Sequence, residues 1–285
     1  MVAKRLLQHA SDSISASKLV TLVCPVYQTI SQLLLTFTNS GAAATAANIK
    51  SGVSKITVLV NGEQVVNISA TDLYNAYAMM GQEVYANATS NSLPLMLGGL
   101  LMKLPETESL ITDIGCDKWA DGAPVTNIQV QVQFASSVTG LTDVQLYSER
   151  LDKGTGLNIT RAVCKLLTYS QTASSTGIFE LDSLPRDARI GRIFSLCTQG
   201  TAVFSTGEAL VNSDPVYQQA DLNTINAMLG ARGYTQPSGT LAFVFSDGSM
   251  ANSLLSMQGV DDFRLKLGIG TAGTFNVCDC TVRAV

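Results

Sequence analysis

The sequence predicts an all-β protein made of two tandem β-sandwiches. Short segments rich in apolar and β-branched residues recur along the chain, separated by turn residues, and several alternate strictly between apolar and polar. Both halves show the same order: strands, a strand pair, one helix, then further strands. The 285 residues suffice for two domains. About 130 residues per half suits an eight-stranded jelly roll with one short helical insertion.

The first half opens with two predicted strands. Residues 18–27 and 30–38 are apolar and β-branched, whereas residues 39–50 are small and polar and predict a long loop. A hairpin follows over residues 55–68, because Asn61-Gly62 suits a type I′ turn, which needs two positive φ angles.

A helix is predicted after this hairpin, with Ser69 or Thr71 as its cap and Gly81 at its end. Its apolar face is formed by Leu73, Ala76, Tyr77 and Met80. The clearest strand of the chain is 127–135, where three glutamines alternate with apolar residues. This alternation is typical of a strand with one buried and one exposed face.

The second half repeats this plan without similar sequence. Its predicted strands are 161–169, 178–181, 190–197, 202–205, 241–245, 263–269 and 275–282. Residues 190–197 and 202–205 are interpreted as a pair across Gln199-Gly200. A helix is predicted over 215–229, with Asp214 as cap and Pro215 in first position.

These patterns give the expected domain boundaries: an N-terminal arm (1–16), a first jelly roll (17–140), a linker (141–156) and a second jelly roll (157–285). The linker is placed where Gly140, Gly154 and Gly156 cluster. The arm carries Lys4 and Arg5 and no acid in its first nine residues. It is either a disordered or docked terminus, or a segment that contacts a neighbouring subunit or an anionic membrane.

The composition of the chain limits the range of possible functions. Charged residues make up 14% of the chain, against about 25% in an average domain. Part of the surface is therefore expected to be buried against partner subunits. The net charge of −4 does not favour nucleic-acid binding, which usually needs a basic face. The six scattered cysteines form no C-x-x-C motif and are expected to be buried, reduced thiols, in keeping with folding in a cytoplasm.

The sequence predicts no catalytic residue and no cofactor-binding residue, so the protein is expected not to be an enzyme. His9 is the single histidine and lies in the terminal arm, which excludes a serine or cysteine triad built on an internal histidine. The spacing of Gly268, Gly270 and Gly273 resembles a dinucleotide-binding loop but lies between two strands and opens no helix.

Three pairs of acids are candidate sites: Asp261-Asp262, Asp117 with Asp121, and Glu106 with Glu108. Neighbouring acids in turns are common, and a metal site remains unknown, with Asp261 and Asp262 as its acidic candidates. Trp119 is interpreted as packing at a sheet edge instead of binding a sugar.

Several segments carry a family resemblance. The opening strand with its Pro25 and Tyr27, the Asn-Gly hairpin within 55–66, and the helix start at Thr71-Asp-Leu73 occur in this order. Together they resemble the N-terminal domain of double jelly-roll major coat proteins of tailless, membrane-containing phages of the corticovirus kind. Residues 114–117 and 127–134 resemble the end of that domain, and 241–247 and 263–285 the end of the second.

This resemblance implies a structural major capsid protein, assembled in a host cytoplasm and located in the virion shell. Three chains would form a pseudo-hexagonal homotrimer, and trimers would tile an icosahedron. The implied partners are sister copies, neighbouring trimers, vertex or minor capsid proteins and, through the N-terminal arm, an internal membrane. Calcium is implied for some such shells, but no residue of a calcium site carries over to this sequence.

Two alternatives remain open at this stage. One is an adhesion or glycan-binding β-sandwich of a spike or fibre, which would capture a specific glycan or receptor. The other is a hydrolase on a β scaffold, whose turnover would depend on Asp261 and Asp262.

Overall fold

The computed structural model describes residues 4–81, 86–87, 90–95, 113–151, 159–187, 189–246 and 254–284. The chain divides into two compact units. The first is made mainly of residues up to Tyr74 and of Glu83–Leu166, and the second of Asn75–Gln82 and Leu167–Arg283. Each unit is a β-sandwich, which confirms the predicted all-β, two-sandwich architecture.

The first unit contains ten strands and two helices among its described residues. The strands are β1 (Lys4–Ser13), β2 (Leu19–Cys24), β3 (Ile30–Asn39), β4 (Ala42–Ala43), β5 (Val53–Val60), β6 (Glu63–Ile68), β7 (Ala86–Asn87), β8 (Ser90–Leu95), β9 (Ile128–Phe134) and β10 (Asp143–Leu151). The helices are α1 (Ala46–Gly52) and α2 (Ala70–Met79), the latter ending in residues grouped with the second unit.

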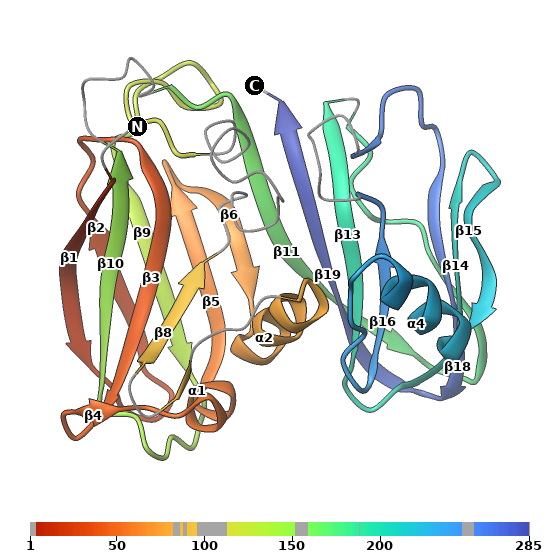
Figure 1. Ribbon diagram of the computed structural model, residues 1–285, viewed down its shortest axis with the longest axis horizontal. Helices are drawn as coiled ribbons and strands as arrows, with labels where there is room; N and C mark the ends of the chain where they lie inside the picture. The colour runs from red at the N-terminus through yellow and green to blue at the C-terminus, as the bar shows by residue number, and fades with distance from the viewer. Residues whose placement is uncertain are drawn as a thin grey trace. The chain divides into compact units, whose positions relative to one another are not determined.

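These strands form two layers (Figure 1). One sheet has the order β1-β10-β3-β8-β7, with β4 paired to β3. The other has the order β2-β9-β5-β6, and β11 (Ala162–Ala173) continues it beside β6. Apolar side chains from both sheets are buried between the layers, among them Val20, Leu22, Leu33, Leu35, Phe37, Ile56, Val58, Val130, Val132, Val144 and Leu146. Burial of these alternating faces stabilises the unit.

The predicted hairpin and helix of this unit are confirmed. Asn61 and Gly62 both have positive φ, 50° and 82°, as a type I′ turn requires. Ser69 Oγ accepts a hydrogen bond of 3.0 Å from the backbone N–H of Asp72 and caps α2. The predicted loop over 39–50 is partly wrong. It contains β4 and the start of α1, whose first turn is capped by Thr45 Oγ1.

The structure places the domain boundary differently from the predicted linker at 141–156. Residues Asp143–Leu151 form β10, which pairs with β1 on one side and β3 on the other. The strand escaped prediction because its inward face carries Ser148 and Arg150 as well as apolar residues, which obscures the apolar period. The division between units falls within β11, after Leu166. Residues 152–158, with Gly154 and Gly156, lie outside the described residues.

The predicted N-terminal arm is ordered over most of its length. Residues Lys4–Ser13 form β1, which pairs antiparallel with β10 at the end of its sheet. The ladder shifts register between Gln8 and Ser11, as a β-bulge does.

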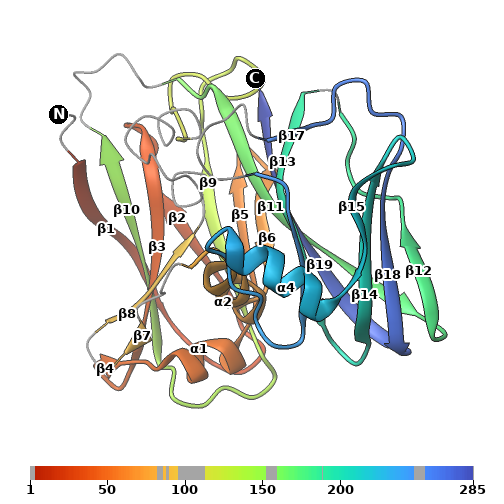
Figure 2. The same cartoon turned by 45° about the vertical axis from the view of Figure 1, so that its right-hand side comes forward.

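The second unit is also a two-layered sandwich (Figure 2). Its further elements are β12 (Gly177–Leu181), β13 (Ile190–Gln199), β14 (Val203–Val211), β15 (Asp214–Asp221), α4 (Leu222–Ala231), β16 (Thr240–Val244), β17 (Leu255–Ser256), β18 (Phe263–Thr271) and β19 (Gly273–Ala284). One sheet has the order β16-β13-β19-β11, with β17 paired to β13. The other has the order β12-β18-β14-β15. Phenylalanines at 204, 243, 263 and 275 contribute to the core between them.

Two expectations for this unit are corrected. The strands at 190–197 and 202–205 do not pair with each other, because β13 pairs with β16, β17 and β19, whereas β14 pairs with β15 and β18. The predicted helix at 215–229 begins seven residues later. Pro215 is the second residue of the edge strand β15, where the missing N–H is tolerated. Asp221 caps α4 through a 2.8 Å bond from the N–H of Thr224.

A buried ion pair joins β13 to β19 in the core of the second unit. Arg192 and Asp279 are almost fully buried and make two hydrogen bonds, of 2.8 and 3.0 Å, between guanidinium and carboxylate. Ser195 Oγ donates a further bond to the carboxylate, and the guanidinium lies over the ring of Phe263. A bidentate pair of this kind fixes the two strands in one register.

No helix among the described residues is long and apolar enough to cross a membrane.

Candidate assembly surfaces

The outward face of the β2-β9-β5 ladder is almost free of charge. Residues that lie directly opposite one another in an antiparallel ladder point to the same side of the sheet. The pairing register therefore assigns to this outer side Leu19, Thr21, Val23, Gln129, Gln131, Gln133, Lys55, Thr57 and Leu59. We call these nine residues the neutral face. Lys55 is its one charged member.

Aliphatic and amide groups dominate what the neutral face exposes. Leu19 is 53% exposed and Val23 52% exposed, both on the edge strand β2. The three glutamines of β9 are half-buried beside them, and Gln133 Nε2 donates to the carbonyl oxygen of Ser17. Solvent-facing sheets usually carry charged side chains, above all at an edge strand, where charge discourages pairing with other chains. A neutral face with exposed aliphatic residues is suited to contact with another protein surface.

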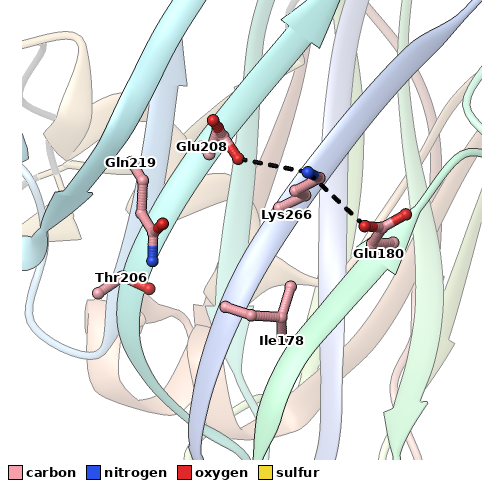
Figure 3. A pocket seen from close by; sticks show the side chains of 6 residues that line it. All are labelled: Ile178, Glu180, Thr206, Glu208, Gln219 and Lys266. Atoms are coloured by element: carbon pink, nitrogen blue, oxygen red, sulfur yellow. Dashed lines mark ion pairs between the residues drawn. The ribbon is translucent and has the colours of Figure 1, made fainter. Parts of the chain in front are cut away.

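The outward face of the β12-β18-β14 ladder in the second unit is different. The register places Glu180 and Glu208 on either side of Lys266. Lys266 Nζ lies 3.7 Å from a carboxylate oxygen of each glutamate (Figure 3). Arg264 continues this row and pairs with Asp262 at 2.6 Å and with Glu180 at 3.5 Å. We call these five residues the charged face.

A shallow hollow lies on the charged face. It is lined by Ile178, Glu180, Thr206, Glu208, Gln219 and Lys266 (Figure 3). Ile178, on the edge strand β12, is 58% exposed, so an exposed aliphatic residue occurs on this face too. The charges of this face are nevertheless paired with one another, as on an ordinary solvent-facing sheet.

The acidic candidates at 261 and 262 do not form a cation site. The carboxylate of Asp262 faces two guanidinium groups, those of Arg264 and, at 4.0 Å, Arg186. These cations oppose the binding of a metal ion. Within the described residues, no group of three or more histidine, cysteine or acidic side chains is arranged to hold a metal. The residues present therefore do not fit calcium at this position.

The other predicted candidates have local structural roles. Asp121 Oδ1 accepts a bond from the backbone N–H of Ala123 within a turn. Trp119 is buried, and its indole N–H donates to Glu63 Oε2 at 3.0 Å, so its ring is not available to stack on a sugar. Glu106 and Glu108 lie outside the described residues.

All six cysteines are buried free thiols, as predicted. Burial raises the pKa of Cys116 to about 11, and burial also raises the pKa values of Cys24 and Cys197. These three thiols therefore stay protonated near neutral pH, which disfavours both nucleophilic chemistry and metal binding through a thiolate.

The neutral face was not foreseen from the sequence. The alternation of Gln129, Gln131 and Gln133 predicted an exposed row, but not its neighbours. A signal was present in β2, where Leu19 and Val23 stand at alternate positions around Thr21. The neutral face forms only because the fold places β2 and β5 on either side of β9.

No protein-family model matches the chain, and no curated protein matches its sequence. Solved structures match over nearly its whole length. The major capsid protein P2 from bacteriophage PM2 is similar at a TM-score of 0.81 with 11% sequence identity, covering 99% of this chain and 98% of that one. The PBCV-1 virus capsid model is similar at a TM-score of 0.66 with 10% identity, covering 100% and 95%.

A chain of the Sulfolobus turreted icosahedral virus structure is similar at a TM-score of 0.67 with 14% identity, covering 99% and 91%. At identities this low the common feature is the fold. The chain therefore has the double jelly-roll fold of viral major capsid proteins, as its motifs led us to expect.

Proposed function

We propose that this protein is the structural major capsid protein of a tailless icosahedral virus and builds the virion shell by packing against copies of itself. The observation that carries this proposal is the match of both jelly rolls, in tandem and over almost the full chain, to viral capsid proteins. The role is structural, and no catalysis is proposed. The adhesion or glycan-binding alternative has no comparable support, since the matching structures are capsid proteins.

The neutral face supports a role in assembly. A charge-poor, partly aliphatic surface loses little hydration free energy when it is buried, and its glutamines can pair with polar groups of a partner. Three strands about 4.8 Å apart and six residues long cover roughly 300 Å². A stable interface buries about 800 Å² per partner. We therefore propose the neutral face as the centre of a larger contact between subunits.

The finer proposals concern the assembly. A homotrimer with a pseudo-hexagonal outline, tiling an icosahedron with vertex or minor capsid proteins, would use closed symmetry to avoid open polymerisation. The N-terminal arm (1–16), which carries Lys4 and Arg5, is proposed to face an internal membrane.

The test compares two matched substitutions. Val23→Glu places a charge on the neutral face, and Ile178→Glu places the same charge on the charged face, at residues of similar exposure. We expect Val23→Glu to abolish trimers and regular particles, because a carboxylate must then be buried without a partner, and Ile178→Glu to leave both intact. Light scattering gives the oligomeric state, electron microscopy shows the particles, and circular dichroism checks that each variant folds.

Two outcomes distinguish an error in the proposed capsid function from an error in the proposed contact surface. If wild-type protein stays monomeric at micromolar concentration and forms no particle, the capsid function itself is wrong. If wild-type protein assembles and Val23→Glu assembles equally well, the function stands and the neutral face is not the contact.

A further inference from the structure

The edge strand β1 is held in place partly by a polar contact with the core side of β10. Among the described strands, β1 pairs with β10 alone, so it is the outermost strand of its sheet. His9 lies within the β-bulge of β1 and is half-buried. Its Nε2 lies 2.6 Å from the hydroxyl oxygen of Ser148, which is fully buried on the inner face of β10.

The hydrogen bonds around Ser148 are compatible with a neutral His9. Arg150 Nε donates to Ser148 Oγ at 2.7 Å, so this oxygen already accepts one hydrogen bond from a group that cannot lose its proton. The hydroxyl hydrogen of Ser148 can then point at His9 Nε2, which accepts it when that nitrogen carries no proton. In this arrangement the imidazole is neutral and unprotonated at Nε2.

Arg150 places a positive charge beside His9, and this charge has no carboxylate partner among the described residues. Arg150 is fully buried, donates through Nη2 to the carbonyl of Pro25 and to Cys24 Sγ, and lies against the ring of Tyr27. Its Nη1 has no hydrogen-bond partner among the residues that the structure describes. A second positive charge at His9 would therefore be repelled and would not be neutralised nearby.

The other ionisable groups around His9 do not neutralise the positive charge of Arg150. Arg5 lies opposite Arg150 in the ladder and is also basic. Glu149 and Asp143 belong to the opposite, outward face of β10, where Glu149 accepts a bond from Ser31. Asp12 is paired with Lys18 Nζ at 2.9 Å, and from β2 the neutral thiol of Cys24 contacts Arg150.

Burial and, secondarily, Arg150 lower the pKa of His9 below its ordinary value of 6.5. A histidine whose pKa is lowered by folding contributes stability that is complete above pH 6.5. That stability is lost as the pH falls from 6.5 toward the pKa of the folded state, because the unfolded or detached segment binds the proton more readily.

We propose that His9 is an acid-sensitive latch: its protonation in mildly acidic solution adds a positive charge beside the buried Arg150, which weakens the contact with Ser148 and detaches β1 from β10. The detached segment would carry the basic N-terminal residues with it, while β10 keeps its pairing with β3. The N-terminal strand would then be freed for other contacts without unfolding of the sandwich.

Hydrogen–deuterium exchange of the full chain at pH 7 and pH 5, corrected for the intrinsic pH dependence of exchange, tests the latch. We expect amides of residues 4–13 to lose protection selectively at pH 5, about tenfold for each pH unit by which the His9 pKa is lowered. Amides of β5 and β9 should keep theirs. In His9→Gln the side-chain oxygen can still accept from Ser148 but does not titrate, so the loss should disappear.

A second measurement follows the titration of His9 directly. His9 is the only histidine, so its imidazole gives one signal in an NMR titration of the wild-type protein. The midpoint should lie below 6.5 and should rise in Arg150→Met. A wild-type midpoint at or above 6.5, or equal loss of β1 protection in wild type and His9→Gln, would overturn the proposal.

Discussion

Each unit of this protein buries one arginine completely, and the two units accommodate the charge by different means. In the second unit Arg192 faces Asp279 in a bidentate pair, with Ser195 as a further donor to the carboxylate. In the first unit Arg150 is held by a backbone carbonyl, a hydroxyl, a thiol and the face of Tyr27. No ion pair to Arg150 occurs within the described part of the chain.

The two arginines therefore have different roles. Arg192 holds two strands together, whereas Arg150 makes its surroundings unfavourable for a second positive charge. A buried charge whose partner is removed is strongly destabilising, whereas a buried charge that has no charged partner leaves no opposite charge behind when it is replaced. Arg192 is therefore expected to be essential for the stability of its unit. Arg150 is expected to matter less for stability, but it makes its surroundings intolerant of a second positive charge, which is the basis of the proposed His9 latch.

Replacing Arg192 should give the largest effect. Arg192→Met leaves the carboxylate of Asp279 buried with Ser195 as its main remaining donor, and we expect a loss of about 3–5 kcal/mol in the free energy of unfolding. Urea denaturation measures this loss. The double variant Arg192→Met, Asp279→Leu removes both charges and should recover most of it. A loss below about 1 kcal/mol in the single variant would show that the pair is no anchor.

Replacing Arg150 should give a smaller effect. Arg150→Met removes hydrogen bonds to Ser148 and Pro25 but also removes a buried charge, and we expect a loss of less than about 2 kcal/mol in the same measurement. The expected difference between the two arginines is wrong if Arg150→Met is as destabilising as Arg192→Met, because Arg150 would then have to be paired with a carboxylate.

The exposed ion pairs of the charged face should give the smallest effect. Lys266 bridges Glu180 and Glu208 on a surface where its side chain is 29% exposed. We expect Lys266→Ala to cost about 0.5 kcal/mol or less, because exposed pairs are screened by water and salt. Denaturation at low salt and at 1 M salt checks this. An effect that is large and independent of salt would mean that this face is not an ordinary hydrated surface.

Local patterns predicted many of the strands, most clearly those whose inward faces are purely apolar. The alternation in 127–135 and 263–269 reappears as β9 and β18, with the predicted residues buried. The Asn61-Gly62 turn and the Ser69 cap were also correct, since both depend on a few adjacent residues. Strand β10 was missed because its inner face is polar at Ser148 and Arg150.

The helix expected at 215–229 shows how one local signal can imitate another. Asp214-Pro215 resembles a helix start, yet these residues open β15, and Asp221 provides the true cap. Tyr217 explains part of this outcome. It is buried against the aromatic rings of Phe243 and Phe245, and its hydroxyl bonds the backbone of Val244. Such packing of distant residues outweighs a weak helical preference.

The sequence by itself determined that this chain is β-rich, divided into two sandwiches and poor in catalytic groups, because alternation, turns and composition are readable within a few residues. Only the tertiary structure decided which strands are neighbours. That choice creates the neutral face from β2, β9 and β5 and brings His9, Ser148 and Arg150 together. These neighbours lie far apart in the sequence, as Leu19 and Gln133 or Thr57 and Gln131 do, so no pattern of a few adjacent residues encodes their pairing.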